Sequence, residues 1–184
     1  MLTHRGTVPL QTERLILRRF QLEDAQAMYT NWACDPEVTR YLTWEPHVSP
    51  DATRELLRDW TAKYEDPTYY NWLIELDGVP IGNVSVVRIN EKSLHAELGY
   101  CMGKLWWNKG LMTEAVTAVT RFLFEEVGVH KLKIRHLVKN PGSGRVAQKC
   151  GFIREGILRE EYLSDGVYMD VAVYGKLDNE SSEK

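Results

Sequence analysis

The stretch Trp106-Trp107-Asn108-Lys109-Gly110-Leu111-Met112-Thr113-Glu114-Ala115 predicts a glycine-bearing turn that runs into an amphipathic helix. It follows a strand-like segment at 96–102. The first backbone N–H groups of a helix have no partner within it, so a turn that gathers them can bind a pyrophosphate, assisted by the helix dipole. Gly110 lets a ligand approach the main chain, and Lys109 adds a positive charge at the same end. Many α/β units share this pattern, so alone it says little about function.

A second signal follows in Asn140-Pro141-Gly142-Ser143-Gly144-Arg145-Val146-Ala147-Gln148-Lys149-Cys150-Gly151-Phe152, which predicts a helix between two strands. Asn140 suits the N-cap, and Gly151 suits a left-handed C-terminal cap. Gly142 and Gly144 each lower helix stability by roughly 1 kcal/mol relative to Ala. A purely structural first turn has no reason to accept both glycines, so we expect a ligand to press against it.

Taken together, these residues resemble the GNAT superfamily of N-acetyltransferases, whose acetyl-CoA loop reads Gln/Arg-x-x-Gly-x-Gly/Ala after the fourth strand. The loop here spans 107–112; it keeps the central Gly and departs from the pattern at Trp107 and Met112. Since main-chain N–H groups hold the ligand, these departures weaken the match only modestly. Within the superfamily the chain looks like the RimJ and RimL branch of ribosomal-protein N-terminal acetyltransferases. Over residues 10–177 that resemblance rests on Thr12-Glu13-Arg14-Leu15-Ile16-Leu17-Arg18, Glu97-Leu98-Gly99-Tyr100, Asn140 with Ser143, Lys149-Cys150-Gly151-Phe152 and Glu161-Tyr162-Leu163.

Apolar periodicity and turn residues predict a mixed sheet covered by helices. Strands are expected at 13–20, 71–76, 79–89, 94–102, 131–138, 152–163 and 167–177. Helices are expected around 25–32, from a Ser49-Pro50 start to about residue 64, and from 111 onward. Asp77-Gly78 and Asp165-Gly166 predict tight hairpin turns. The strand-helix-strand crossover through the glycine turn must be right-handed and parallel if it joins neighbouring strands.

The resemblance implies one acetyltransferase domain over residues 1–177, and we expect the polar tail, 178–184, to be disordered. The implied fold is α/β (α+β), a GNAT-like mixed, mostly antiparallel central sheet flanked by helices. In that fold the two central strands, here ending near Met102 and Val138, splay apart and the pantetheine arm of acetyl-CoA lies in the gap.

Charge, cysteine content and the N-terminal segment argue against several classes of protein. A net charge of −3 and a pI near 6.0 argue against nucleic-acid binding through a broad basic face. Cys34, Cys101 and Cys150 form neither a metal-ligand spacing nor an even disulfide set, so we expect no metal and a reducing cytoplasm. Residues 1–10 contain no apolar run, and we expect neither a signal peptide nor a membrane span there.

Acetyl transfer from a thioester to an amine needs a neutral amine, a polarised carbonyl and a proton for the leaving thiolate. A peptide α-amino group, with a pKa of about 8, is roughly one-tenth neutral at pH 7. A lysine amine, with a pKa of about 10.4, is neutral in fewer than about one molecule in a thousand. An N-terminal amine therefore requires the least from a catalytic base.

The resemblance places the catalytic base at Glu161 and the acid at Ser143, which would protonate the CoA sulfur. Glu97, on the strand before the glycine turn, is the rival base, although strand alternation could equally turn it toward solvent or a neighbouring arginine. Many GNAT enzymes carry an acidic Tyr four residues after the Ser. That position is Ala147 here, which leaves the proton to Ser143 or to water.

The resemblance also implies the residues that bind acetyl-CoA, namely Tyr100, Cys101, Met102, Trp107, Asn108, Lys109, Gly110, Leu111, Met112, Thr113, Asn140, Arg145 and Lys149. If the resemblance holds, Asn140 would contact the pantetheine amides. From its neighbouring residues alone, Asn140 would serve only as the N-cap of the helix. Cys101 has no histidine nearby in sequence to activate it, so we expect a small core residue rather than an acyl-cysteine nucleophile. His47 and His136 are expected to be structural, whereas Trp44 and Glu45 would shape the acceptor pocket.

The sequence thus predicts a cytoplasmic, acetyl-CoA-dependent N-acetyltransferase that acts on a primary amine, with a protein N-terminus favoured. Two alternatives stay open. Acetylation of a polyamine, amino acid or antibiotic would need a compact pocket around Trp44 and Glu161, and a non-catalytic acyl-CoA sensor would need neither base nor acid. RimL-like enzymes often form homodimers, but no stripe here marks an interface. Neither a nucleic acid nor a membrane is expected as a partner.

Overall fold

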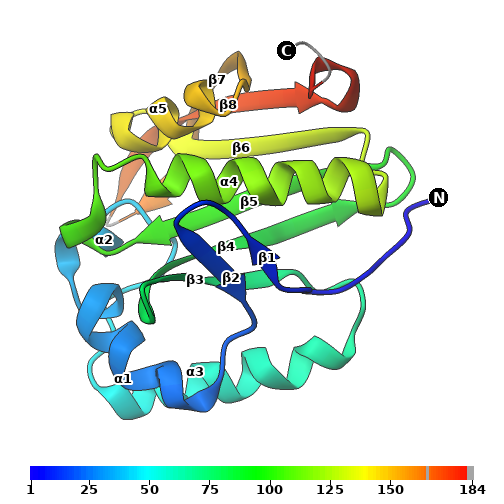
Figure 1. The fold of residues 1–184 in the computed structure, drawn as a ribbon. Helices are drawn as coiled ribbons and strands as arrows, with labels where there is room; N and C mark the ends of the chain where they lie inside the picture. The colour runs from blue at the N-terminus through cyan, green and yellow to red at the C-terminus, as the bar shows by residue number, and fades with distance from the viewer. Residues whose placement is uncertain (165, 182–184) are drawn as a thin grey trace. The chain divides into compact units, whose positions relative to one another are not determined.

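The computed structural model describes residues 1–164 and 166–181. Its strands are β1 (Leu10–Gln11), β2 (Leu15–Arg18), β3 (Asn71–Leu76), β4 (Val79–Asn90), β5 (His95–Met102), β6 (Lys131–Leu137), β7 (Ile153–Ser164) and β8 (Val167–Leu177). They form one sheet in the order β1-β2-β3-β4-β5-β6-β8-β7 (Figure 1). β5 and β6 are parallel, whereas β1–β2, β2–β3, β3–β4, β6–β8 and β7–β8 are antiparallel. The predicted mixed, mostly antiparallel sheet is confirmed.

The helices are α1 (Ala25–Met28), α2 (Pro36–Thr39), α3 (Pro50–Ala62), α4 (Leu111–Phe122) and α5 (Pro141–Lys149). Short 3₁₀ segments lie at Leu22–Asp24, Lys63–Glu65, Lys104–Trp106 and Asp178–Ser181, and π segments at Tyr29–Ala33 and Leu123–Val127. The helix expected around 25–32 therefore changes from α to π geometry partway along. α2 was not expected from the sequence; Asp35 caps its first turn by accepting from the N–H of Glu37 at 2.8 Å. None of the helices in the described ranges is long and apolar enough to cross a membrane.

The chain divides into two compact units. The N-terminal unit consists of His4–Val86 and Tyr100–Val119. The C-terminal unit consists of Met1–Thr3, Val87–Gly99 and Thr120–Lys184. Each unit carries part of the residues that the sequence analysis selected.

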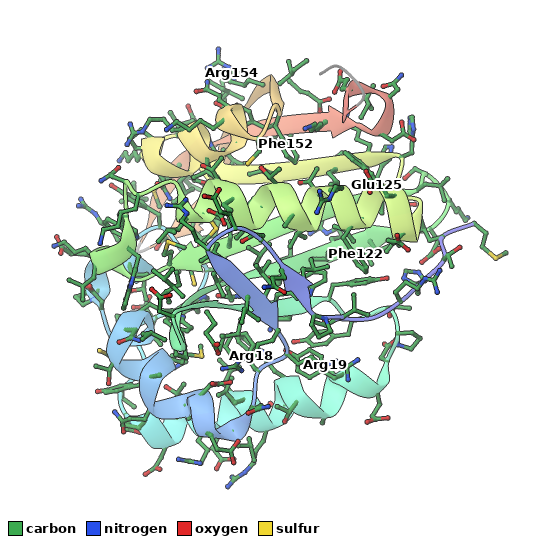
Figure 2. The ribbon with its side chains drawn as sticks, viewed as in Figure 1. Arg18, Arg19, Phe122, Glu125, Phe152 and Arg154 are labelled. Carbon is green, nitrogen blue, oxygen red and sulfur yellow. The ribbon has the colours of Figure 1, made fainter. Side chains whose placement is uncertain are left out.

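In the N-terminal unit, α1 and α3 pack against each other over an apolar cluster that includes Met28, Trp32 and Leu57. Arg18 lies at the end of β2 (Figure 2). It pairs with Asp24 at 2.8 Å and with Glu75 of β3 at 2.7 Å. The carboxyl group of Asp24 is largely buried, so the guanidinium compensates a charge that water does not reach freely. This ion-pair network fixes β2 against β3 and the start of the helical layer.

The hairpin between β3 and β4 is confirmed where Asp77-Gly78 predicted it. Both turn residues adopt left-handed backbone geometry, with φ of 49° and 78°. That geometry matches the right-handed twist of the flanking strands, which is why Asp-Gly favours a two-residue hairpin. The second predicted turn, Asp165-Gly166, lies partly outside the described residues because residue 165 is not among them.

In the C-terminal unit, β5 and β6 pair in parallel from His95–Lys131 to Leu98–Ile134. Within the described chain this pairing ends there, although β6 continues to Leu137. α5 contacts β6 and β7 (Figure 1). Its C-terminus has the expected cap, since Gly151 has φ of 80° and the N–H of Phe152 donates to the carbonyl of Ala147 at 3.0 Å. This six-to-one bond is typical of a Schellman motif.

The start of the C-terminal tail differs from the expectation of disorder. Residues 178–181 form a 3₁₀ turn in which the N–H of Asp178 donates to the carbonyl of His130 at 3.1 Å. The N–H of Leu177 donates to a carboxylate oxygen of Glu180 at 2.9 Å. These contacts tie polar residues to the end of β8, which composition alone did not indicate. Residues 182–184 lie outside the described part of the chain.

Candidate active site

The glycine turn joins the end of β5 to α4 through two left-handed residues, Asn108 with φ of 60° and Gly110 with φ of 76°. Trp107 anchors the turn, because its indole Nε1 donates to the carbonyl of Met102 at 2.7 Å. The Trp107 departure from the family pattern therefore has a structural role. The side chains of Leu111 and Met112 are buried, so only their main-chain groups are available at the start of α4.

The N–H groups of Gly110, Leu111 and Met112 meet no acceptor within the described residues. Further along the first turn, the N–H of Glu114 donates to the carbonyl of Gly110 at 3.0 Å. Free N–H groups at a helix start, together with the exposed side chain of Lys109, can bind an anion such as a pyrophosphate. This local geometry is compatible with binding of a pyrophosphate, and the donor-binding role of the turn stays a prediction.

Cys101 lies in the core of the N-terminal unit rather than in a reactive environment. Its residue surface is only half-buried, yet its sulfur packs against the apolar cluster and donates to Oδ1 of Asn83 at 3.0 Å. Burial raises the pKa of this thiol to about 12. A thiol held protonated at neutral pH is a poor nucleophile, which fits the expectation of a small core residue.

In the C-terminal unit, Asn140 caps α5, because its Oδ1 accepts from the N–H of Ser143 at 3.3 Å. The side-chain NH₂ of Asn140 has no partner among the described residues. The cap uses the oxygen, and the NH₂ remains able to donate to a carbonyl of a ligand. The two roles considered for Asn140 are therefore compatible, since they use different atoms.

The reason for Gly144 is internal packing, which corrects the expectation that a ligand explains both glycines of this helix. A Cβ added at Gly144 would lie 2.9 Å from Nε2 of His136 and 3.4 Å from the hydroxyl of Tyr174. His136 and Tyr174 stack with ring centroids 5.5 Å apart. At Gly142 a Cβ would meet only Oδ1 of Asn140, at an ordinary 3.5 Å, so internal packing does not explain this glycine.

Glu161 lies in a bulge of β7, where the register with β8 shifts between Leu158 and Tyr162. Within the bulge Glu160 has φ of 52°, a strained value for a residue other than glycine, and its N–H donates to Asp170 of β8 at 2.9 Å. The carboxylate of Glu161 accepts from Nη2 of Arg135 on β6 at 2.6 Å. Strain of this kind often marks a functional site.

The bulge forms the wall of an open hollow of about 720 Å³. Its lining residues are Ile157, Leu158, Arg159, Glu160, Glu161 and Asp170. Carboxylates outnumber the one arginine of this lining, which favours a cationic ligand such as a protonated amine. The hollow belongs entirely to the C-terminal unit.

The other predicted catalytic groups occupy less specific surroundings. Glu97 of β5 is half-buried and lies opposite Lys133 of β6 in the strand register. Ser143 is half-buried in the first turn of α5. Ala147 is fully buried, so the position of the family tyrosine belongs to the core in this chain.

The remaining predicted residues are dispersed. Arg145 and Lys149 of α5 are exposed, and Arg145 lines a second hollow of about 240 Å³ between α5, β7 and β8. Trp44 packs against the apolar cluster of the N-terminal unit, whereas Glu45 is exposed. His47 contacts Oγ1 of Thr53 through Nδ1 at 2.7 Å, and burial lowers its pKa, which fits a structural role.

The partners of the site residues were not evident from the sequence. Arg135 lies in the strand predicted at 131–138, and nothing near it in sequence pointed to Glu161. Asp170 was likewise an ordinary polar residue of β8. The motif at 12–18 supported the family resemblance. Nothing in the sequence around Arg14 indicated that this residue contacts the glycine turn. Within the described ranges, no group of three or more His, Cys, Asp and Glu residues could hold a metal ion.

Comparisons with known proteins identify the family of the chain. Residues 14–153 match the family described as acetyltransferase (GNAT) domain. The chain is 30% identical over 182 residues to the [ribosomal protein uS5]-alanine N-acetyltransferase of Escherichia coli (strain K12), covering 92% of each chain. It is 30% identical over 167 residues to the N-acetyltransferase YoaA of Bacillus subtilis (strain 168), covering 90% of this chain and 94% of that one.

Among solved structures, the fold matches that of RimL, a ribosomal L7/L12 α-N-protein acetyltransferase in complex with coenzyme A, with a TM-score of 0.84. This match covers 92% of this chain and 98% of the other at 20% sequence identity, so it supports the fold alone. The family match extends over most of the chain and includes the glycine turn and α5. The chain therefore belongs to the GNAT acetyltransferase family and is an acetyl-CoA-dependent N-acetyltransferase.

Proposed function

We propose that this enzyme acetylates the α-amino group of a protein or peptide N-terminus, with Glu161 as the general base. The observation that carries the proposal is the Glu161 carboxylate, held by Arg135 at 2.6 Å at the wall of an open, carboxylate-rich hollow. A hollow of about 720 Å³ has room for more than a single ammonium group. The similarity to the uS5-alanine N-acetyltransferase supports the same class of acceptor.

The donor would be bound through main-chain and amide groups. The free N–H groups of 110–112 bind the pyrophosphate of acetyl-CoA, and the side chain of Lys109 contributes a positive charge. On the C-terminal unit, the NH₂ of Asn140 donates to a pantetheine carbonyl while its oxygen keeps α5 capped. Arg145 and Lys149 remain candidates to bind the phosphates of acetyl-CoA, and Tyr100–Met102 and Thr113 remain candidates for further contacts with it. Trp44 and Glu45 remain candidates to contact the acceptor.

The proposed reaction is direct transfer. The amine nitrogen attacks the thioester carbon, the carbon–sulfur bond breaks, and no acyl-enzyme forms. Glu161 takes the proton that the amine loses, directly or through a water molecule. The hydroxyl of Ser143 donates a proton to the leaving thiolate and regains one from solvent. Arg135 acts on the carboxylate rather than on the substrate, since it fixes the direction in which Glu161 points.

Glu97 is the competing base, and the strand register gives it Lys133 rather than an arginine as its neighbour. We favour Glu161 because it lies in a strained bulge beside the hollow, where a side chain held at an angle to the sheet can reach a bound amine. Since the relatives modify ribosomal proteins by name, we also propose that the enzyme acts in the cytoplasm.

Release of CoA with a matched panel of acceptors tests the proposal. The panel comprises a peptide with a free N-terminus and no lysine, the same peptide with a blocked N-terminus and one lysine, and small amines such as a polyamine. We expect acetylation of the first peptide, confirmed by mass spectrometry of its N-terminal residue. Acetylation of the small amines alone would show that the acceptor is a small molecule. Binding of acetyl-CoA without acetylation of any amine would favour a sensor.

A further inference from the structure

Glu114, in the first turn of α4, presents a negative charge where a pyrophosphate would bind. It follows the residues of the glycine turn that carry the free N–H groups, Gly110, Leu111 and Met112, by only two to four positions in the sequence. A negative charge at this end of a helix is favourable for the helix itself but opposes a second anion at the same place. A turn that binds acetyl-CoA therefore needs Glu114 to be neutralised or directed away.

The segment at 12–14 does both. The carboxylate of Glu114 accepts from Oγ1 of Thr12 at 2.6 Å and from the backbone N–H of Arg14 at 2.9 Å. It also accepts from Nε of Arg14 at 2.7 Å, and Nη2 lies 2.7 Å from the same oxygen. This two-point contact fixes the planar guanidinium against the carboxylate, as is typical of arginine.

The same guanidinium also holds the glycine turn. Nη1 of Arg14 donates to the carbonyl of Lys109 at 3.1 Å, and a Cβ built at Gly110 would lie 3.6 Å from Nη2. One carbonyl of the turn is thereby engaged, and the backbone is held between two left-handed residues, Asn108 and Gly110. All of these residues belong to the N-terminal unit.

We infer that Arg14 is a positioning residue of the acetyl-CoA site, which fixes the backbone of the glycine turn at Lys109 and compensates the charge of Glu114 beside the pyrophosphate. The inference rests on the proposed binding of pyrophosphate by this turn. Arg14 contacts neither the reacting thioester nor the acceptor in this account. Its replacement should therefore weaken donor binding and leave the rate of the chemical step unchanged.

A comparison of two acetyl donors separates this role from general damage to the fold. Acetyl-CoA carries the pyrophosphate, whereas acetyl-pantetheine lacks it. We expect Arg14→Met to raise KM for acetyl-CoA about tenfold, because Glu114 is then an uncompensated charge at the helix start. The kcat and the KM for acetyl-pantetheine should stay within about twofold of the wild-type values.

The double variant Arg14→Met with Glu114→Gln should recover part of the lost affinity for acetyl-CoA, because the opposing charge is gone. Arg58→Met serves as the control, since this exposed arginine of α3 pairs with Glu55 and has no contact with the turn among the described residues. If Arg14→Met does not fold, Arg14→Lys keeps the charge but loses the planar contact, and should raise KM for acetyl-CoA by a smaller factor.

Two results distinguish failure of this inference from failure of the proposed donor site. If the wild-type enzyme has the same KM for both donors, the turn does not bind pyrophosphate and the proposed site is wrong. If the wild-type enzyme prefers acetyl-CoA and the Arg14 variants keep that preference in full, the inference about Arg14 is wrong. Equal losses with both donors would likewise contradict it, because they would indicate a structural role.

Discussion

Arg135 on β6 donates from Nη2 to the carboxylate of Glu161 on β7 at 2.6 Å, although β8 lies between the two strands. Two long side chains span the intervening strand, and Glu161 lies in the bulge that interrupts the regular ladder of β7 and β8 next to Glu160. About half of the Glu161 side chain remains exposed, at 44%, so the carboxylate is oriented by protein and still reached by solvent. Such a group can accept a proton and release it to water.

Glu161→Gln should lower kcat about 100-fold at neutral pH, because the amide cannot take the amine proton. Binding of CoA should change little, since the glycine turn is left intact. The measurements are initial rates of CoA release and a binding isotherm for CoA. Glu97→Gln is the matched control, and we expect nearly normal turnover from it. Normal turnover in Glu161→Gln together with a large loss in Glu97→Gln would assign the base to Glu97.

Two substitutions at Asn140 should separate capping from ligand binding. Asn140→Asp keeps an oxygen that accepts from the N–H of Ser143 but removes the NH₂ donor. We expect its thermal stability to match the wild type and its KM for acetyl-CoA to rise about tenfold. Asn140→Ala should lose both, with a cost of about 1 kcal/mol for the cap. Wild-type KM in the Asp variant would reduce Asn140 to an N-cap.

The two glycines of α5 should respond oppositely to alanine. In Gly144→Ala the added Cβ would lie 2.9 Å from His136, and we expect a loss of about 1–3 kcal/mol in the free energy of unfolding. In Gly142→Ala the added Cβ meets only an ordinary contact, so the helix should gain up to about 1 kcal/mol. Denaturant titration of both variants measures these changes. A stabilising Gly144→Ala would contradict the packing assigned to His136 and Tyr174.

Cys101 should be inert to thiol reagents in the native protein. Burial raises its pKa to about 12, so at pH 8 only a minute fraction is thiolate. We expect Cys34, which is partly accessible, to react first with an aromatic disulfide, and Cys101 to react only on unfolding. Cys101→Ala should retain turnover. A complete loss of turnover in a folded Cys101→Ala variant would revive the acyl-cysteine mechanism.

The contribution of Glu114 to stability should disappear in acid. Partial burial acts to raise the pKa of this carboxyl, but the hydrogen bonds from Thr12 and Arg14 outweigh it and hold the pKa below its usual value. Because the folded-state pKa is depressed, the contribution is complete above the ordinary pKa of about 4.3 and is lost as the pH falls through the folded-state pKa. The Tm difference between the wild type and Glu114→Gln should be larger at pH 7 than at pH 3. A difference that grows in acid would contradict this sign.

Local chemistry made several parts of the fold predictable. Asp77-Gly78 specifies its hairpin because a two-residue turn needs left-handed geometry at both positions. Asn140 at one end of α5 and Gly151 at the other specify a helix through hydrogen bonds that its own termini lack. The glycine turn before α4 was recognisable for the same reason. Each feature depends on residues close together in the sequence, where the pattern can be read directly.

Long-range partners were not predictable, and they decide how the site works. Glu161 was selected from a family resemblance, but only the tertiary structure supplies Arg135 and the bulge in which Glu161 lies. Similarly, Gly144 looked like a position for a ligand until His136 was found beside it. No periodic pattern or local motif in the sequence indicates either contact, because partners far apart in sequence meet only when the strands pair.

The sequence by itself determined the family, the donor and the secondary structure around the glycine turn, because these depend on backbone N–H groups and on glycine, asparagine and proline at fixed local positions. The tertiary structure alone decided which charges compensate one another. Arg14, just before β2, pairs with Glu114 and donates to the carbonyl of Lys109. Arg135 pairs with Glu161 across β8. Ion pairs depend on distances in space, and those distances are set by packing of the whole sheet.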